Sequence, residues 1–311
     1  MSKAAGLPPV DMSVTVGPLT LRSPVLVGSG TFGFGEEYAG YCDLARLGAI
    51  VTKAVTLEPR EGNPGPRVWE TAAGMLNAIG LQNPGLDKVV AEKLPLLLAA
   101  GHPVIVNIAG FEVGEYVKLA EALDAVEGLA AIEVNVSCPN VAHGGIEFGR
   151  DPAVLSGLVR AVRAATHLPL IVKLSPNVSD IVPLAEAALD AGADVLSLTN
   201  TLVGMAIDAR LRRPRLANVT GGLSGPAIKP VALRMVWQVW QALRAPIIGM
   251  GGIMTGEDAA EFMLAGAAAV AVGTANFVDP TSAGRVAAEL EEFCRQQGVA
   301  RVAELTGALQ S

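Results

Sequence analysis

Short runs of aliphatic residues recur along the chain, and most are followed by a stretch whose apolar positions have helical spacing. Near-continuous aliphatic runs are typical of parallel strands that helices cover on the outside. Eight such runs occur, the number of strands in a (β/α)8 barrel, so we predict an α/β fold of the TIM-barrel type. The predicted strands are 24–30, 49–56, 103–110, 131–140, 169–176, 194–201, 246–253 and 269–276.

Capping signals mark several of the predicted helices. Asp151 and Pro152 have the character of an N-cap and first helical residue for a helix over 151–166. Thr255 and the acidic residue three positions later form a variant of the capping box at a second helix. A third helix is predicted over 36–48.

Three segments fall outside the repeating pattern. Residues 14–23 alternate around a Gly-Pro turn and predict a short β-hairpin that closes the bottom of the barrel. The connections 57–83 and 202–225 are longer than a barrel needs, and we predict structureless functional loops at its C-terminal face. No second domain is indicated, so residues 1–311 are predicted to form a single domain.

Composition and charge narrow the class of function. Hydrophobic residues make up 51% of the chain and aromatic residues 4%, so the core must be mainly Ala, Val, Ile and Leu. The net charge of −7 and the lack of a basic run disfavour nucleic-acid or membrane-surface binding. The N-terminus lacks signal- and transit-peptide patterns, and no stretch is long and apolar enough to span a membrane, which predicts a cytoplasmic protein.

Cysteines and histidines are few and scattered. An odd number of distant cysteines argues against a disulfide framework and is too small for an iron–sulfur cluster with four cysteine ligands. Cys42 and Cys294 fall on predicted amphipathic helices, where packing is the expected role. The three histidines show no metal-ligand spacing, so we predict no metal site.

Polar residues stand at or near the ends of most predicted strands. A buried Lys or Asn in an apolar strand is costly unless paired, and although any single Asn is as often structural, the set indicates a site. Lys53 and Lys173 suit an anion, an electron-rich ring or a Schiff base. The members of this set are Ser29, Lys53, Asn107, Asn135, Lys173, Thr199 and Asn200.

Glycines replace these polar residues at the ends of the last two strands. Gly249, Gly251 and Gly252 lead towards the helix predicted to begin at Thr255, and Gly273 and Thr274 lie in the eighth predicted strand. Backbone N–H groups beside a helix N-terminus form a phosphate cradle, which predicts a phosphorylated ligand. Tight turns also require glycine, so the pattern is only moderately specific.

Cys138 follows the fourth strand, in a loop that carries Gly144, Gly145 and Gly149. Such a loop can bring a thiol down onto a bound ligand while its glycines allow opening and closing. We therefore predict that the chemistry centres on Cys138.

Together these segments resemble the class 1 dihydroorotate dehydrogenases, from about residue 12 to about residue 280. Each motif alone is weak, but the combination is highly specific. The resemblance rests on SGTFGFGEEY, VTKAVTLEPREGNPGPR, NAIGLQNPG, VNVSCPN, SLTNT, GMGGI and VGT.

The resemblance implies an FMN cofactor and assigns its contacts. Flavin contacts would be Ser29, Lys53, Ala54, Asn107, Asn135, Lys173 and Thr199. Phosphate contacts would be Gly225, Gly251, Gly252, Gly273 and Thr274. Substrate contacts would be Lys53, Asn77, Ala78, Ile79, Gly80, Leu81, Asn135, Asn200 and Thr201.

The implied reaction is oxidation of dihydroorotate to orotate in pyrimidine biosynthesis. Cys138 would be the general base that removes a proton from C5, while hydride leaves C6 for the flavin. Lys173 would stabilise charge on the reduced flavin, and Lys53 would be a second catalytic residue that holds substrate and flavin in register.

Within the family, the sequence resembles class 1B most. A cysteine base and the lack of a membrane-directed extension separate it from class 2. Class 1B implies a homodimer with a partner subunit that carries FAD and a 2Fe–2S cluster and passes electrons to NAD+. Alternatives are a fumarate-dependent class 1A enzyme, a flavoenzyme like dihydropyrimidine dehydrogenase, a barrel that only binds a phosphorylated ligand, and a Schiff-base lyase using Lys53 or Lys173.

Overall fold

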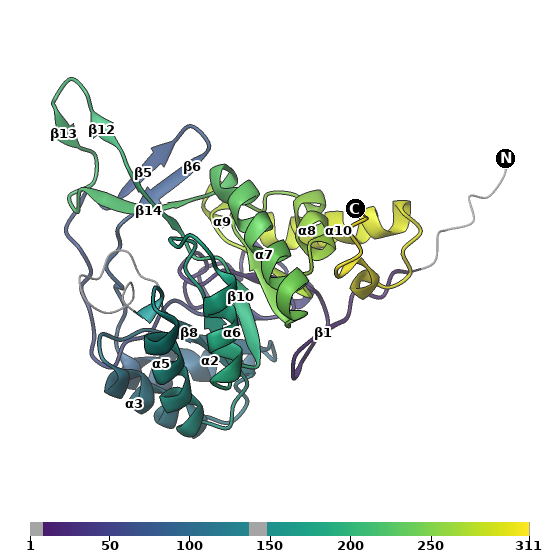
Figure 1. Cartoon of the computed structure of the whole chain (residues 1–311), viewed down its shortest axis with the longest axis horizontal. Helices are drawn as coiled ribbons and strands as arrows, with labels where there is room; N and C mark the ends of the chain where they lie inside the picture. The colour runs from purple at the N-terminus through teal and green to yellow at the C-terminus, as the bar shows by residue number, and fades with distance from the viewer. Residues whose placement is uncertain (1–8, 137–147, 311) are drawn as a thin grey trace.

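A computed structural model describes residues 9–136 and 148–310 of the chain (Figure 1). Eight parallel strands form one sheet in the order β3-β16-β15-β10-β9-β8-β7-β4. Each lies within one of the eight predicted runs, so the strand predictions are confirmed. The strands are β3 (Val25–Val27), β4 (Ile50–Val51), β7 (Val104–Ile108), β8 (Ala131–Asn135), β9 (Leu170–Lys173), β10 (Val195–Leu198), β15 (Ile247–Met250) and β16 (Ala269–Val272).

The sheet curls into a nearly closed barrel. Strands β3 and β4 stand at the two ends of the ladder, and one backbone hydrogen bond joins their edges: Gly48 N donates to Val25 O at 2.8 Å. Because consecutive strands are parallel and helices connect most of them, the architecture is the predicted (β/α)8 barrel.

Helices cover the outside of the sheet in chain order (Figure 1). The predicted N-caps are confirmed, since Asp151 accepts from Ala153 N and Val154 N, and Thr255 forms a capping box with Asp258. The main helices are α2 (Leu94–Ala99), α3 (Val113–Asp124), α5 (Pro152–Ala164), α6 (Val182–Asp190), α7 (Lys229–Leu243), α8 (Gly256–Leu264) and α10 (Ser282–Gln296).

The prediction of a helix over 36–48 is wrong. Only a 3-10 turn over Leu44–Arg46 forms there, and the remainder is turns and bends. Gly40 divides the segment, and Asp43 ends its first half by accepting a hydrogen bond from Ala45 N, so neither half is long enough to nucleate a helix. Cys42 is nevertheless buried, as is Cys294 in α10, where burial raises the pKa of the Cys294 thiol to about 11.

The predicted N-terminal hairpin is confirmed as β1 (Val14–Val16) and β2 (Leu19–Leu21). Its strands alternate buried and exposed residues, as the sequence indicated. At its turn, a Cβ on Gly17 would lie 2.9 Å from Asp194 O, one residue before β10 begins. The hairpin therefore packs against the N-terminal ends of the barrel strands.

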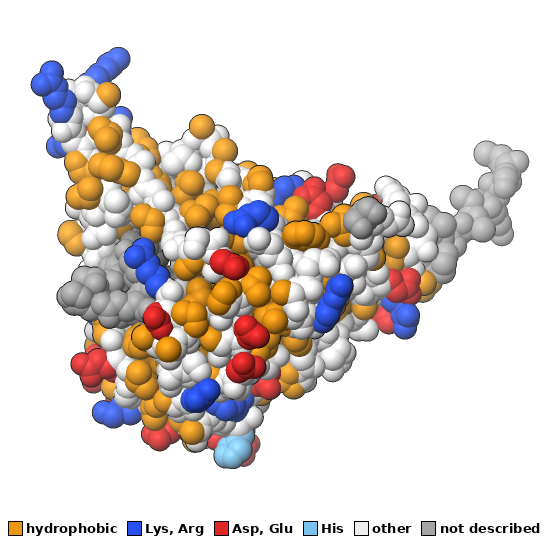
Figure 2. Space-filling view, viewed as in Figure 1, with side chains coloured by type: hydrophobic (Ala, Val, Ile, Leu, Met, Phe, Trp, Pro, Cys, Tyr) orange, Lys and Arg blue, Asp and Glu red, His pale blue; other side chains and the backbone are white. Residues whose placement is uncertain are grey.

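The two long connections are not structureless, which corrects the prediction. They pair into an antiparallel sheet in the order β11-β14-β6-β5, and the second also forms a small hairpin; we call both together the arm. It projects from one end of the barrel in Figure 1, and Figure 2 shows hydrophobic and basic side chains near its tip. Its strands are β5 (Val68–Thr71), β6 (Gly74–Asn77), β11 (Leu202–Met205), β14 (Thr220–Ser224), β12 (Ile207–Asp208) and β13 (Arg213–Pro214).

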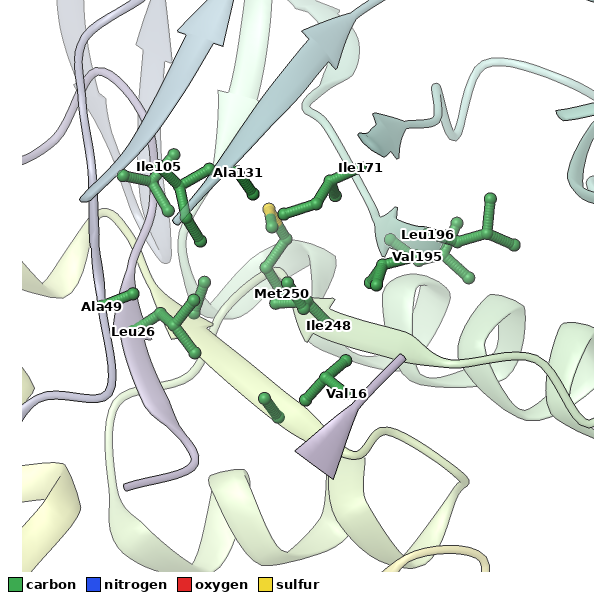
Figure 3. Close-up of a cluster of buried hydrophobic side chains, with 14 of the residues drawn as sticks. Val16, Leu26, Ala49, Ile105, Ala131, Ile171, Val195, Leu196, Ile248 and Met250 are labelled. Carbon is green, nitrogen blue, oxygen red and sulfur yellow. The ribbon is translucent and has the colours of Figure 1, made fainter. Parts of the chain in front are cut away.

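An apolar layer fills the barrel interior. Side chains of Ile105, Ala131, Ile171, Ile248 and Met250 come from β7, β8, β9 and β15 and converge in Figure 3. All five are buried, and successive residues of a strand point to opposite faces, so positions two residues further along face the same interior. No helix among residues 9–136 and 148–310 is long and apolar enough to cross a membrane.

Candidate active site

A cavity of about 600 Å³ lies between the C-terminal ends of the barrel strands and the arm. Its volume falls within the range of about 300–1,000 Å³ that small-molecule sites occupy. The arm and its flanking loops contribute Arg67, Val68, Met75, Asn77, Ile79, Gly80, Leu81, Gln82, Thr201, Ser224 and Gly225. The barrel contributes the floor, including Ser29, Lys53, Ala54, Asn135, Lys173, Thr199, Asn200, Met250, Gly251, Gly252, Gly273 and Thr274.

Most of the residues singled out in the sequence meet at this cavity, but four do not line it or cannot be placed. Gly249, expected in the phosphate cradle, lies within β15, where a Cβ would meet Phe262 and Ala267 instead. Asn107 is fully buried and does not line it. Ala78 is buried against Leu76 and Leu216, and its own backbone N–H and C=O bond to Arg67 O and Asn63 Nδ2. Cys138 lies outside the described residues.

Lys173 is the buried cation of the cavity floor. Its ammonium donates to Ser29 Oγ at 2.9 Å and lies 4.0 Å from Glu133 Oε2. Glu133, from the middle of β8, is itself 1% exposed. The alternation within β9 explains the placement, because Lys173 is two residues beyond Ile171 and shares its inward face.

Lys53 follows β4 and is half-buried at the cavity. Its backbone N–H donates to Gly33 O at 2.9 Å, which ties it to the loop after β3. Burial lowers the pKa of the Lys53 ammonium, the positive charge of Arg67 lowers it further, and Glu37 partly opposes the shift. The site thus holds two lysines with different surroundings, one paired with a carboxylate and one facing another cation.

A chain of amides runs from the barrel to the arm. Asn200 Nδ2 donates to Asn135 Oδ1 at 3.1 Å, and Asn200 Oδ1 accepts from Thr201 N at 2.8 Å. On the arm, Asn77 Nδ2 donates to Gly222 O at 3.2 Å. Each amide carries both donors and acceptors, so this wall suits a planar ligand with the same groups on its rim.

Glycines form the other end of the cavity. Gly225, Gly251 and Gly252 have positive φ angles of 95°, 127° and 85°, which disfavour any other residue. At Gly273 a Cβ would meet nothing closer than Thr31 Cγ2 at 3.9 Å, so close packing does not explain this glycine. Nearby, Thr274 Oγ1 donates to Ser224 Oγ at 2.7 Å.

The start of α8 does not supply free donors to this end, contrary to the sequence-based expectation. Met254 N and Thr255 N donate to Asp258 Oδ2 at 2.8 and 2.9 Å. Gly256 N donates to Glu289 Oε2 at 2.8 Å. Because these N–H groups are already bonded to carboxylates, an anion here would depend on the glycine loops themselves.

Comparison with known proteins identifies the family to which this chain belongs. The family model described as dihydroorotate dehydrogenase matches residues 11–294. The chain belongs to the dihydroorotate dehydrogenase family. It is therefore an oxidoreductase, and family membership separates it from the Schiff-base lyases and from barrels that only bind a phosphorylated ligand.

Individual dihydroorotate dehydrogenases are similar over nearly the full length. A protein of Geobacter sulfurreducens is 60% identical over 300 residues, covering 96% of this chain and 98% of the relative. One of Geobacter metallireducens is 59% identical over 300 residues, with the same coverage. One of Desulforudis audaxviator is 60% identical over 299 residues, covering 96% and 97%. All three are named dihydroorotate dehydrogenase B (NAD(+)), catalytic subunit.

Two charged residues of this dihydroorotate dehydrogenase site were missed in the sequence. Arg67 lines the cavity and donates to Gln82 Oε1 at 2.6 Å; its position as a cation in a Gly- and Pro-rich segment was the available signal. Glu133 lies in mid-strand, so a search for polar residues at strand ends passed over it. Within the described residues, no group of three or more His, Cys, Asp or Glu could hold a metal ion.

Proposed function

We propose that this chain oxidises dihydroorotate to orotate in pyrimidine biosynthesis, using FMN and passing electrons to NAD+ through a partner subunit. The observation that carries the proposal is the cavity itself, where a buried, paired Lys173 meets a wall of amides. The relatives' names support the reaction and the acceptor, and they favour NAD+ over the fumarate of class 1A.

The residues present fit FMN. Asn107 Oδ1 and Thr199 Oγ1 are buried polar atoms without a hydrogen-bond partner in the described part of the chain. Such atoms are costly unless a ligand completes them, which supports a polar ring system at the floor. Ser29, Lys53, Ala54, Asn135, Lys173 and Thr199 line the cavity and would hold the flavin ring, with Asn107 beneath the floor and Gly225, Gly251, Gly252, Gly273 and Thr274 at the phosphate.

When bound, FMN would supply the two-electron acceptor that the oxidation requires. Lys173 would hold positive charge at the ring, fixed in place by Ser29 and Glu133. Because this charge is positioned before the reaction, no reorganisation is needed as negative charge accumulates.

The arm and the amides would hold the substrate. Asn77, Asn135 and Asn200 offer paired donors and acceptors to the amide groups of the substrate ring. Lys53 would bind the substrate carboxylate, with Thr201 and the backbone of Ile79, Gly80 and Leu81 completing the wall. Ala78, whose side chain and backbone are engaged by protein, would support this loop and make no substrate contact.

Cys138 is proposed as the general base on the resemblance of VNVSCPN, since it lies outside the described residues. A free thiol has a pKa near 8.5, so a cysteine base would work close to its titration point. We expect Cys138→Ser to retain FMN and to lose most dihydroorotate oxidation, because serine is a far weaker base. Unchanged turnover would remove Cys138 from the mechanism.

The partner would be a separate electron-transfer subunit with FAD and a 2Fe–2S cluster, bound to a homodimer of this chain. The printed name "catalytic subunit" of the relatives supports a second subunit. The chain's three cysteines cannot provide four thiolate ligands, so such a cluster would belong to the partner.

One experiment tests the proposal directly. The purified chain should carry a yellow flavin that is released on denaturation and identified as FMN, and anaerobic dihydroorotate should bleach it. Dihydrouracil is the matched control, because it lacks the carboxylate expected to need Lys53. A protein that binds no flavin, or that dihydrouracil bleaches as fast as dihydroorotate, contradicts the proposal.

A further inference from the structure

A polar layer lies directly beneath the cavity floor. Asn107, Glu133, Lys173 and Ser197 come from four adjacent strands, and each stands two positions after an apolar residue of its strand. The ladder registers pair Asn107 with Glu133 and Lys173 with Ser197. The period-two alternation therefore turns all four side chains into the barrel interior.

Glu133 is the centre of this layer. Its Oε2 accepts from Asn107 Nδ2 at 2.6 Å, and its Oε1 accepts from Ser197 Oγ at 2.8 Å. Lys173 Nζ lies 4.0 Å from the same Oε2. An unpaired buried carboxylate costs several kcal/mol. Two hydrogen bonds and one cation therefore compensate the burial of the Glu133 carboxylate, which is 1% exposed.

The first consequence concerns the Asn107 amide. A carboxylate only accepts hydrogen bonds, so Nδ2 of Asn107 must face Glu133 and Oδ1 must face away. That oxygen is buried and has no partner in the described part of the chain. Glu133 thus presents Asn107 Oδ1 as a fixed acceptor, suited to a ligand N–H.

The second consequence concerns charge. Lys173 reaches the cavity and is held on its other side by Ser29 Oγ at 2.9 Å. Glu133 does not line the cavity, so its negative charge acts on a ligand only through the low-dielectric layer and through Lys173. Charges interact strongly in such surroundings, because little water screens them.

We propose that Glu133 is a positioning residue that, by orienting Asn107 and offsetting the charge of Lys173, sets the preference of this site for oxidised over reduced flavin. The inference rests on the proposed FMN function and adds a residue that does not touch the ligand. Without the carboxylate, Lys173 would present an uncompensated positive charge, which favours the reduced, more negative ring.

Glu133→Gln tests this inference, since it removes the charge at nearly constant shape. Apo-protein is titrated separately with oxidised and with chemically reduced FMN, so the readout is affinity and no turnover is needed. We expect the ratio of affinities, reduced over oxidised, to rise about tenfold, equivalent to about 30 mV in the two-electron potential. An unchanged ratio in folded Glu133→Gln overturns the inference.

Two further variants separate charge from structure. Ser197→Ala removes one hydrogen bond from Glu133 but leaves the charge, so its ratio should stay within about twofold of the parent. A tenfold shift in this control would assign the effect to disturbed packing and overturn the inference.

Glu133→Asp decides the matter should Glu133→Gln fail to fold. It keeps the charge but withdraws the carboxylate from Asn107, so both flavin affinities should fall together with the ratio unchanged. Unchanged affinities, or a shifted ratio, overturn the inference. Parent protein that binds no FMN contradicts the proposed function instead, so the two failures are distinguishable.

Discussion

The barrel sheet and the arm are both built from strands, yet their side chains face different surroundings. Every residue of β7, β8, β9 and β10 is buried. In the arm, β5 and β11 carry mostly exposed or half-buried residues, and Ile207 is 60% exposed. The cavity lies between the two regions, so one of its walls is a packed core and the other is a thin sheet.

This contrast divides the roles of the two regions. The barrel contributes the charged floor, where any change disturbs close packing as well as ligand binding. The arm contributes the substrate-facing wall at little cost to global stability, because few of its contacts are buried in the main core. The same kind of substitution should therefore lower stability more in the barrel than in the arm.

The largest difference is expected for loss of a cation. Lys173→Met leaves the buried Glu133 carboxylate without its cation, which should lower the free energy of unfolding by about 3–5 kcal/mol. In the arm, Arg215 lies 2.7 Å from Asp208 and is half-buried. Arg215→Met should cost less, since the Arg215 side chain is 34% exposed and water can solvate what remains of the pair. Urea denaturation of the two variants measures both values.

These measurements belong on apo-protein. Bound flavin stabilises the folded state in proportion to its affinity, so loss of ligand from Lys173→Met would otherwise be counted as loss of intrinsic stability. Equal losses of unfolding free energy in Lys173→Met and Arg215→Met would show that the cation of the floor contributes no more to stability than the cation of the arm.

A smaller difference is expected for loss of apolar bulk. Ile105 is fully buried in the barrel interior, so Ile105→Ala should cost about 2–5 kcal/mol through lost contacts and a residual cavity. Val203, in β11 of the arm, is 46% exposed, and Val203→Ala should fall within about 0.5 kcal/mol of the parent. A Val203→Ala loss comparable to that of Ile105→Ala would mean that something covers the arm in solution.

The same contrast explains which elements could be predicted from sequence. Barrel strands bury both faces and appear as continuous aliphatic runs, such as PVIVNIAG around β7. Strand β14, with sequence TGGLS, has no such run, and it pairs with β6 through Gly222 and Asn77. Those partners are far apart in the chain, so no local pattern could reveal the second sheet.

The site was predictable to the extent that it stands on strand ends. Ser29, Asn135 and Lys173 could be located because polar residues interrupt apolar runs there. Glu133 was missed because the layer beneath the floor is defined by contacts between strands. Arg67 was missed because its position over the cavity depends on the arm.

A selective effect on ligand binding is expected within the arm. A Cβ at Gly222 would lie 2.1 Å from Thr201 Oγ1, so Gly222→Ala must displace this proposed substrate contact. Orotate should bind about tenfold more weakly, a change of about 1.4 kcal/mol, with the urea midpoint little altered. Isothermal titration with orotate measures the first value.

Gly204→Ala is the matched control for this prediction. Its Cβ would lie 3.0 Å from Leu76 Cδ2, the end of a side chain that can move. No atom of Thr201 lies within 4 Å of this Cβ. Orotate affinity should therefore stay within about twofold of the parent. Equal weakening by both variants would point to a general distortion of the arm.

The smallest expected effect is the electrostatic influence of Arg67, beside the arm, on Lys53 of the barrel. Burial and the charge of Arg67 hold the pKa of Lys53 below its usual value. Between the folded and the unfolded pKa the unfolded chain binds more protons, so stability rises with pH over that alkaline interval. Arg67→Gln should raise the pKa of Lys53, narrow the interval and reduce this rise.

Orotate binding provides the sharper measurement of the same coupling. If the Lys53 ammonium binds the carboxylate, affinity should decline at alkaline pH as that proton is lost. In Arg67→Gln the decline, normalised to each variant's own plateau, should move to higher pH, whereas Arg215→Gln should leave it in place. If the decline in Arg67→Gln stays at the same pH or moves to lower pH, Arg67 does not lower the pKa of Lys53.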